Sequence, residues 1–280
     1  MSRPLSLVSI TSHQNDVFSS LSTCVDGRGD FVLVHGIKLI SELLKTDNTR
    51  VNLELKTLVA RESFYSAMTS AEPASGAKLG LELFSRRFEK PITRISLLDK
   101  LFDEIDPVGV PDALAAFMKP KLLKLSDTKE PSGPTLVTAT QNPANLGALI
   151  RSASAFGFKN LVTLKEAAHP YHARTVRGSM GHIFDLNCYQ GPSISALRGL
   201  PAAIQSRLIT LDLEGEPLHT FKWPKAPIIL IGEEGRGVPD AAEGLRVNIP
   251  HLSHVDSLNA AVSGGIAMYD YFEKTLREKP

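Results

Sequence analysis

The sequence has few of the residues and patterns that mark several large protein classes. Only two cysteines, Cys24 and Cys188, occur in 280 residues, and they lie outside any CxxC pattern, which argues against a disulfide framework or a structural zinc site. The eight histidines form no HExxH motif, so we expect no metal. No apolar run approaches membrane-spanning length, and the N-terminus resembles neither a signal nor a transit peptide. These absences predict a soluble, cytoplasmic protein with no membrane partner.

An excess of charge of either sign is also missing. The 31 basic and 30 acidic residues give a net charge of +1, so the overall charge does not indicate a nucleic-acid partner. Hydrophobic residues make up 42% of the chain and charged residues 22%, as in an ordinary globular protein. A chain of 280 residues is long enough for one large or two moderate domains, each with its own core.

The clearest break in the chain lies at residues 118–134, where Lys, Pro, Ser and Gly accumulate and the hydrophobic periodicity lapses. We therefore predict an N-terminal domain over residues 1–118, a linker over 119–133 and a second domain over 134–280. The first domain is predicted to be a small α/β domain, because strand-like and helix-like segments alternate in it. The segments concerned are a strand followed by a helix in "FVLVHGIKLISELLK", strands in "VNLELKTLVA" and "ITRISLL", a helix near 61–69, and "VPDALAAFMK", which fits either type.

The second domain alternates more sharply between apolar strands and helices. Helical patterns begin near Asn145, Tyr171 and Ser193. Continuous apolar strands separated by helices predict a parallel sheet covered on both faces, whose ligands bind at the carboxyl ends of the strands. The predicted strands are "TLVTA" (135–139), "LVTL" (161–164), "RLITLD" (207–212) and "PIILIG" (227–232).

Residues 131–158 carry a single charged side chain, that of Arg151, in a stretch that otherwise has the composition of a buried core. Pro143 and Asn145 mark the start of a helix and would place Arg151 on its second turn. Its neighbours on the helix are all small: Gly147, Ala148, Ser154 and Ala155. Such a face lets another backbone or a ligand come close, but a lone arginine also commonly lies at a domain edge or pairs with a structural carboxylate.

A second stretch, "IILIGEEGRGVPD", runs from a strand directly into Gly232, Gly235 and Gly237. Its spacing is neither GxGxxG nor that of a phosphate-binding P-loop, so a dinucleotide or triphosphate site is poorly supported. Glu233 and Glu234 suit a cation or hydroxyl groups better than an anion. A glycine-rich turn of this kind also occurs as plain loop geometry.

A third stretch, "NIPHLSHVDSLNAAVSGGIAMYDYF", predicts a helix near the C-terminus that Asp256 or Ser257 caps. The helix is unusually slim, because small residues fill its first turns: Ala260, Ala261, Ser263, Gly264 and Gly265. A purely structural interpretation is a capped helix with a close-packed interface, in which Ser257 and Asn259 serve only as capping residues.

Taken in order, "NPANLGALIRSASAFGF", "LIGEEGRGVP" and "IPHLSHVDSLNAAVSGGIAMY" resemble the three motifs of the SpoU-type RNA 2′-O-ribose methyltransferases of the SPOUT superfamily. The resemblance covers roughly residues 134–275. More weakly, "SHQNDVFSSL" and "FVLVHGIKLISELL" are similar to the L30e-like substrate-binding domain that precedes many such enzymes, although His35 stands where an acidic or amide residue is common.

The resemblance implies a trefoil-knotted α/β catalytic domain that binds S-adenosyl-L-methionine, works as a homodimer and needs no metal. It places Asn145 and Arg151 in the first motif and Glu234 in the second. The third motif contributes Ser257 and Asn259. Main-chain groups at three further positions are expected to hold the cofactor: Gly232, Ile249 and Leu258. Ser253 departs from the pattern, which usually has glycine there. The flanking His251 and His254 are expected to be exposed loop residues, with contact to RNA as the alternative.

Arg151 has a chemical reason to stand alone in this setting. A ribose 2′-hydroxyl is a weak acid, so a nearby cation or base must favour the developing alkoxide as the methyl group is transferred. Arg151 is the candidate, either as an anchor for the neighbouring RNA phosphate or as a group acting on the proton, and its high pKa favours the first role. Ser257 and Asn259 would orient the nucleotide or the arginine, and Glu234 would support the loop or the arginine.

The expected reaction is 2′-O-ribose methylation of structured RNA, ribosomal RNA rather than transfer RNA, with S-adenosyl-L-homocysteine as the product. Two alternatives within the family are a transfer-RNA methyltransferase and a non-catalytic RNA-binding relative. The second would be expected to lose Arg151, Ser257 or Asn259, all of which are present. A nucleotide-dependent α/β enzyme that uses "GEEGRG" as its phosphate loop is disfavoured, because no Lys-Ser/Thr follows.

Overall fold

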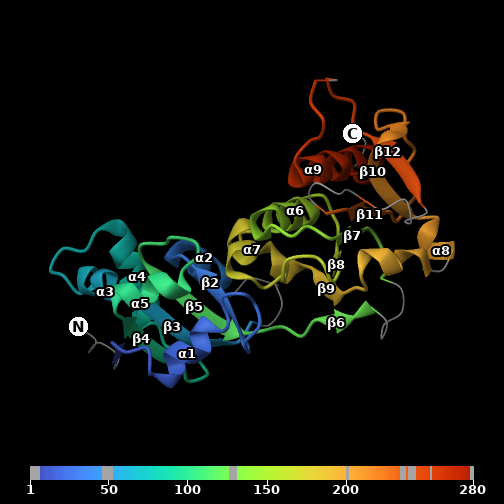
Figure 1. Ribbon diagram of the computed structural model, residues 1–280. Helices are drawn as coiled ribbons and strands as arrows, with labels where there is room; N and C mark the ends of the chain where they lie inside the picture. The colour runs from blue at the N-terminus through green and yellow to red at the C-terminus, as the bar shows by residue number, and fades with distance from the viewer. Residues whose placement is uncertain are drawn as a thin grey trace. The chain divides into compact units, whose positions relative to one another are not determined.

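The computed structural model describes residues 7–45, 53–125, 131–199, 202–233, 238, 244–252 and 254–277. Spatial contacts divide the chain into two compact units (Figure 1). The first unit comprises Met1–Pro120 and Tyr171–Arg177. The second comprises Lys121–Pro170 and Gly178–Pro280.

The first unit contains a mixed five-stranded sheet in the order β1-β4-β3-β5-β2. The strands are β1 (Val8–Ile10), β2 (Phe31–His35), β3 (Leu55–Arg61), β4 (Thr93–Leu97) and β5 (Ala113–Met118). β5 runs antiparallel to both β3 and β2, and the other pairs are parallel. The segment "VPDALAAFMK", whose pattern fits either a helix or a strand, thus contains a central strand, β5. Its residues Ala113–Phe117 are all buried, so neither a period of 2 nor one of 3.6 shows in the sequence.

Helices that flank this sheet complete the predicted α/β domain: α1 (Asp16–Ser22), α2 (Ile37–Leu43), α3 (Glu62–Met68), α4 (Ser75–Ser85) and α5 (Asp99–Ile105). The strand–helix pair β2–α2 and the helix near 61–69 are as predicted. A core cluster that includes Leu33, Phe102 and Leu114 joins the sheet to its helices.

His35, at the end of β2, is a buried structural residue. Its Nε2 lies 3.1 Å from the carbonyl oxygen of Ile105 and 3.8 Å from a carboxylate oxygen of Asp106. Burial lowers the pKa of His35, although the Ile105 carbonyl and the Asp106 charge oppose that shift. A neutral ring that donates a hydrogen bond to the Ile105 carbonyl fits this buried position. The side chain is too deeply buried to contact RNA.

Several arginines of the first unit bind main-chain carbonyls. Arg94 donates from Nε to Phe84 O at 2.8 Å and from a terminal nitrogen to Arg86 O at 2.7 Å. Arg86 in turn donates to Leu44 O at 3.0 Å, and both guanidinium groups lie within 6 Å of the ring centre of Phe88. These side chains therefore help to hold the turn after α4 in place.

The second unit contains a seven-stranded sheet in the order β12-β10-β11-β7-β8-β9-β6, and all its pairs are parallel. The predicted parallel sheet is confirmed, and all four predicted strands belong to it. The strands are β6 (Leu123–Lys124), β7 (Thr135–Thr138), β8 (Asn160–Thr163), β9 (Asn187–Gln190), β10 (Leu208–Pro217), β11 (Ile228–Ile231) and β12 (Leu245–Asn248). β6 lies within residues 119–133.

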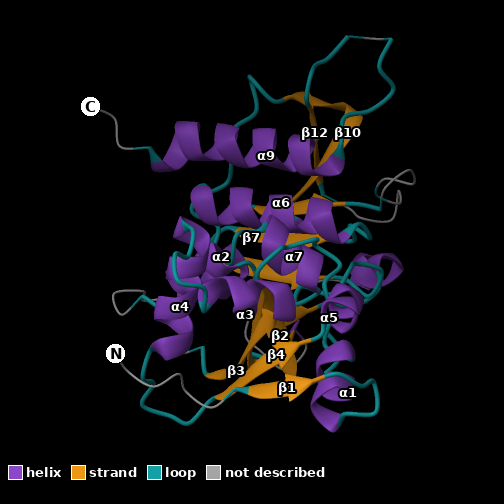
Figure 2. Cartoon of the chain, turned by 90° about the vertical axis from the view of Figure 1, so that its left-hand side faces the viewer, coloured by secondary structure: helices purple, strands orange, loops and turns teal. Residues whose placement is uncertain are grey.

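Helical segments connect and cover these strands: α6 (Pro143–Ala155), η2 (His182–Asp185), η3 (Ile194–Gly199), α8 (Ala202–Gln205), α9 (Ala260–Tyr271) and the π-helical turn η4 (Phe272–Leu276). α7 (Ala173–Gly178) follows β8 in the chain, but its residues up to Arg177 belong to the first unit. α6 and α9 lie side by side, as both views show (Figures 1 and 2). No helix among the described residues is long and apolar enough to cross a membrane.

Two residues of α6 differ from the prediction in their position on the helix. The N-cap is Asn142, whose side chain accepts from the amides of Ala144 and Asn145, and Pro143 is the first helical residue. Asn145 therefore lies inside the first turn. Arg151 falls on the third turn rather than the second.

Small residues let the helices of this unit approach closely, as expected. A Cβ added at Gly178 would lie 3.3 Å from the Cα of Gly147 on α6. A Cβ at Gly264 on α9 would overlap Cδ2 of Leu149 and lie 3.3 Å from Cδ1 of Ile231. Glycine at 264 thus keeps α9 close to both α6 and β11, and glycine at 178 lets the end of α7 approach α6.

Candidate active site

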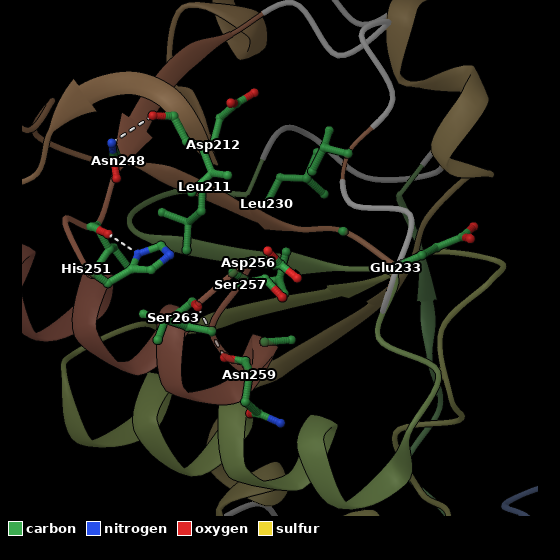
Figure 3. A pocket seen from close by; sticks show the side chains of 17 residues that line it. Leu211, Asp212, Leu230, Glu233, Asn248, His251, Asp256, Ser257, Asn259 and Ser263 are labelled. Atoms are coloured by element: carbon green, nitrogen blue, oxygen red, sulfur yellow. Dashed lines mark hydrogen bonds between the residues drawn. The ribbon is translucent and has the colours of Figure 1, made fainter. Parts of the chain in front are cut away.

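A cavity of about 450 Å³ lies at one edge of the second unit's parallel sheet (Figure 3). Its wall is built from the segment that follows β11, the segment between β12 and α9, and a short part of β10. The segments after β11 and β12 lie beyond the carboxyl ends of their strands, where the alternation of strands and helices predicted a ligand site, whereas the lining residues of β10 lie within that strand. The volume is that of a small-molecule site.

The three predicted cofactor-holding positions all line this cavity. Gly232 follows β11, Ile249 follows β12, and Leu258 lies just before α9. Ser257 and Asn259, predicted from the third motif, line it as well. The predicted residues of the second and third motifs thus meet around one cavity. Glu234 lies outside the described residues.

Asn259 is the N-cap of α9, where the sequence had suggested Asp256 or Ser257. Its Oδ1 accepts from the amides of Ala261 at 2.9 Å and Val262 at 3.3 Å. Its Nδ2 donates to Oδ1 of Asn145 at 3.3 Å. The cap forces the amide oxygen toward the helix, so the NH₂ group points to the first turn of α6.

This arrangement joins the first and third motifs at the rim of the cavity. Asn145 is held by the first turn of α6, and Asn259 begins α9. Ser257 is exposed on the cavity wall between Asp256 and Leu258. A polar group of a substrate at this rim can therefore reach a hydroxyl and two carboxamides.

Arg151 is exposed on α6 and is not part of the cavity wall. Among the described residues none forms a hydrogen bond or an ion pair with it. Its guanidinium is thus available to a ligand or another chain. The interpretation in which Arg151 pairs with a structural carboxylate finds no support in the described part of the chain.

Near Arg151, one turn further along α6, lies a polar cluster that the sequence analysis missed. Ser154 Oγ lies 3.3 Å from Nδ1 of His182 and 3.3 Å from Oδ2 of Asp185, and that imidazole nitrogen and carboxylate oxygen are 2.6 Å apart. The i, i+3 spacing of His182 and Asp185 on η2 was the only local signal. The cluster ties η2 to α6.

The wall of the cavity is acidic. Asp212, Glu233 and Asp256 contribute carboxylates, and no described lysine or arginine lines the cavity. Arg246 neutralises Asp212 at 3.0 Å, and the amide of Glu214 donates to the same carboxylate. Such a wall disfavours a phosphate-bearing nucleotide and suits a neutral or cationic ligand.

The wall residues that were not predicted to lie there include Asp212 and His251. Asp212 comes at the end of the predicted strand 207–212, and that position was an available signal. His251 was expected to be an exposed loop residue, but it is half-buried and lines the cavity. His254, by contrast, is exposed as expected, and Ser253 lies outside the described residues.

Comparison with known proteins finds similarity to methyltransferases over the part of the chain that builds the cavity. Residues 135–269 match the model of the SpoU rRNA Methylase family. The chain is 34% identical over 171 residues to ribosomal RNA small subunit methyltransferase G 2 of Syntrophobacter fumaroxidans, a match over 60% of this chain and 33% of that protein. It is 30% identical over 138 residues to the 23S rRNA (uridine(2479)-2′-O)-methyltransferase of Streptomyces viridochromogenes, over 46% of this chain and 48% of that protein. The chain thus spans a third to a half of the length of these curated relatives.

The fold is shared over nearly the whole chain with a solved structure. The SpoU methyltransferase AviRb of Streptomyces viridochromogenes, determined in complex with the cofactor AdoMet, superposes with a TM-score of 0.71. The match is 23% identical and covers 95% of this chain and 100% of that one. The expected SPOUT-type fold with a parallel sheet is therefore confirmed. Residues 135–269, just under half of the chain, are thus similar to the SpoU rRNA Methylase family, and this stretch includes the segments that build the cavity.

Proposed function

We propose that this chain transfers the methyl group of S-adenosyl-L-methionine to a ribose 2′-hydroxyl of structured RNA and releases S-adenosyl-L-homocysteine. The observation that carries the proposal is the convergence of Gly232, Ile249 and Leu258 on one cavity, with Ser257 and Asn259 at its rim. The two relatives described above are ribosomal RNA methyltransferases, which supports ribosomal RNA as the substrate rather than transfer RNA.

The cavity fits this cofactor in size and in charge. Leu211, Leu230 and Ile249 supply an apolar wall, and the carboxylates of Glu233 and Asp256 suit a ligand that carries a sulfonium and an ammonium group. Gly232, Ile249 and Leu258 would hold it through main-chain groups. When bound, the cofactor supplies an electrophilic methyl group on sulfur, so the protein's task is alignment.

Arg151 is proposed as the catalytic cation. It would bind the phosphate next to the target ribose with two hydrogen bonds, which orients the sugar and stabilises the oxyanion that develops as the hydroxyl loses its proton. Its exposure and its lack of a partner among the described residues support this role. Because Arg151 does not line the cavity of its own chain, we propose that it acts at the cavity of a second copy.

Asn145, Ser257, Asn259 and Glu234 are proposed to position the nucleotide and Arg151. The hydrogen bond between Asn259 and Asn145 supports a shared role, because it fixes both carboxamides at the rim. Ser257 can donate its hydroxyl proton to a phosphate or ribose oxygen. Glu234 would support the loop after Gly232.

A homodimer is part of the proposal. Val262, Ile266 and Tyr269 recur at helical spacing on α9 and are 52%, 36% and 49% exposed. An apolar stripe of this kind, next to the small residues of α6, suits self-association. We also propose that the chain segments around the cavity form a trefoil knot, as the family resemblance implies.

We propose that residues 1–118 form an L30e-like domain that binds the RNA, that 119–133 form a linker, and that 134–280 form the methyltransferase domain. The densest basic cluster in residues 1–118 comprises Arg86, Arg87, Lys90 and Arg94, and clustered cations of this kind can bind RNA phosphates. Its members are largely engaged: Arg86 and Arg94 bind carbonyls, and Lys90 lies 3.2 Å from Glu54. A cytoplasmic location is proposed too, supported by the free thiols of Cys24 and Cys188.

The proposal is tested by equilibrium binding of S-adenosyl-L-methionine to the purified protein, followed by transfer of tritiated methyl groups to total RNA. We expect saturable binding and incorporation of label into ribosomal RNA. Binding without transfer to any RNA would favour the non-catalytic alternative. Absence of binding would contradict the proposal.

A further inference from the structure

His251 presents a ring nitrogen to the cavity. Its Nδ1 lies 2.8 Å from the carbonyl oxygen of Ile249, two residues earlier in the chain. The ring extends from the wall toward the middle of the cavity (Figure 3). Pro250, between the two residues, restricts its own φ angle, and the bond to Ile249 orients the ring.

The bond to Ile249 determines which ring nitrogen carries the proton. A carbonyl oxygen can only accept, so Nδ1 must be the donor. In a neutral imidazole the other nitrogen, Nε2, is then an acceptor. His251 therefore offers a hydrogen-bond acceptor of fixed orientation on the cavity side.

The surroundings of His251 indicate which part of a ligand it meets. His251 and Leu211 lie on one side of the cavity, and Glu233 lies on the opposite side (Figure 3). Ile249 adds a further apolar side chain next to the histidine. A flat heterocyclic base fits the apolar side, whereas the charged amino-acid part of the cofactor fits the carboxylates.

We infer that Nε2 of His251 accepts a hydrogen bond from the exocyclic 6-amino group of the cofactor's adenine and thereby selects adenine over a 6-oxo purine. The inference rests on the proposed function, because it takes S-adenosyl-L-methionine as the occupant of the cavity. His251 is thus a specificity residue for the base. Removing its acceptor weakens binding of adenine but not of hypoxanthine.

Two substitutions separate the nitrogens of the ring. His251→Asn places an amide NH₂ near the position of Nδ1, so it can keep the bond to Ile249 while losing the acceptor at Nε2. His251→Gln places an amide oxygen near the position of Nε2. His254→Asn is the matched control, because His254 is exposed and is not part of the cavity wall.

The experiment measures binding of S-adenosyl-L-homocysteine and of its 6-oxo analogue, S-inosyl-L-homocysteine, by calorimetry at pH 8. We expect His251→Asn to weaken binding of the adenine compound by about tenfold, the effect of one lost hydrogen bond in a partly buried site. His251→Gln and His254→Asn should stay within about threefold of wild type. The preference for adenine over hypoxanthine should shrink in His251→Asn only, with the melting temperature of the ligand-free protein unchanged.

Three results would overturn the inference. Unchanged affinity in His251→Asn, with normal binding by wild type, would remove His251 from recognition and leave the proposed function standing. Equal weakening for both compounds would show that the acceptor does not face the 6-amino group. Wild-type protein that binds neither compound would contradict the proposed function itself, and the inference with it.

Discussion

The carboxamide of Asn259 donates a 3.3 Å hydrogen bond to Oδ1 of Asn145, across 114 residues of sequence. The same side chain caps α9 through its oxygen. One residue therefore sets the start of a helix and links two motifs at the rim of the proposed active site. These two functions use different atoms, so substitution can separate them.

Asn259→Asp keeps an oxygen that can cap α9 but removes the NH₂ donor to Asn145. We expect its melting temperature to stay near that of wild type, while methyl transfer falls by at least about tenfold, since a charge now faces Asn145. Asn259→Ala loses the cap too and should be destabilised by about 1 kcal/mol. Thermal unfolding and initial rates measured on both variants provide the check. Full activity in Asn259→Asp would contradict a role for the bridge.

Arg151→Ala should abolish methyl transfer. No described lysine or arginine lines the cavity, so none there can replace Arg151 in binding the phosphate or stabilising the developing oxyanion. Affinity for S-adenosyl-L-homocysteine should stay within a few fold, since Arg151 is not part of the cavity wall. Lys159→Ala, at an exposed position just beyond α6, is the control. Near-normal turnover in Arg151→Ala would remove this residue from the mechanism.

Gly264 and Gly265 are adjacent on α9 but differ in the space around them. A Cβ at Gly264 would overlap Leu149, which is fully buried, whereas one at Gly265 would lie 3.5 Å from Oγ of Ser152. Gly265→Ala should be neutral or gain up to about 1 kcal/mol from helix propensity. Gly264→Ala should be less stable than Gly265→Ala by at least about 1 kcal/mol because of overpacking. Chemical denaturation monitored through the single tryptophan, Trp223, compares the two. The reverse order of stability would contradict the packing described.

His35 should make the first unit sensitive to acid. Burial lowers its pKa in the folded chain, so below pH 6.5 the unfolded chain binds more protons, and stability falls as the pH falls. One such group contributes a slope of at most about 1.4 kcal/mol per pH unit. Amide hydrogen exchange of β2 between pH 7.5 and 5.5 should show this dependence in wild type and less of it in His35→Asn. His219→Asn, at an exposed histidine of the second unit, is the control. An identical pH dependence in His35→Asn and wild type would contradict the assignment.

Much of the second unit could be predicted because its strands are continuous apolar runs between helices. β7, β8, β10 and β11 were found in this way, and so was the edge at which the cavity lies. β12, "LRVN", was missed because it has only four residues and two of them are charged or polar. It therefore contains no continuous apolar run. Short edge strands of this type are defined by their partner, here β10, rather than by their own sequence.

The first unit shows where local patterns fail. β5 is rich in alanine, a helix-former, yet it is the strand between β3 and β2. Its small side chains are buried on both faces, and burial decides the conformation. The order of strands in the sheet depends on such long-range pairing, which periodicity does not reveal.

Several residues at and near the cavity were predicted from the sequence, but the hydrogen bonds between them were not. Motif order and resemblance brought out Asn145, Ser257 and Asn259, and the structure adds that Asn259 is the cap and the bridge. Local spacing could not show that His251 turns into the cavity, because this depends on the bond to Ile249. The Ser154–His182–Asp185 cluster joins two segments 28 residues apart, and its only local signal in the sequence is the i, i+3 spacing of His182 and Asp185.

The central claim is that this cavity delivers a methyl group to a ribose oxygen. It is tested most directly by incubating ribosomal RNA with the purified protein and tritiated S-adenosyl-L-methionine, digesting the RNA to nucleosides and separating them by chromatography. The label is predicted to elute with a 2′-O-methylated nucleoside and to be absent when Arg151→Ala replaces the wild type. Label on a base-methylated nucleoside, or equal labelling by both proteins, would contradict the claim.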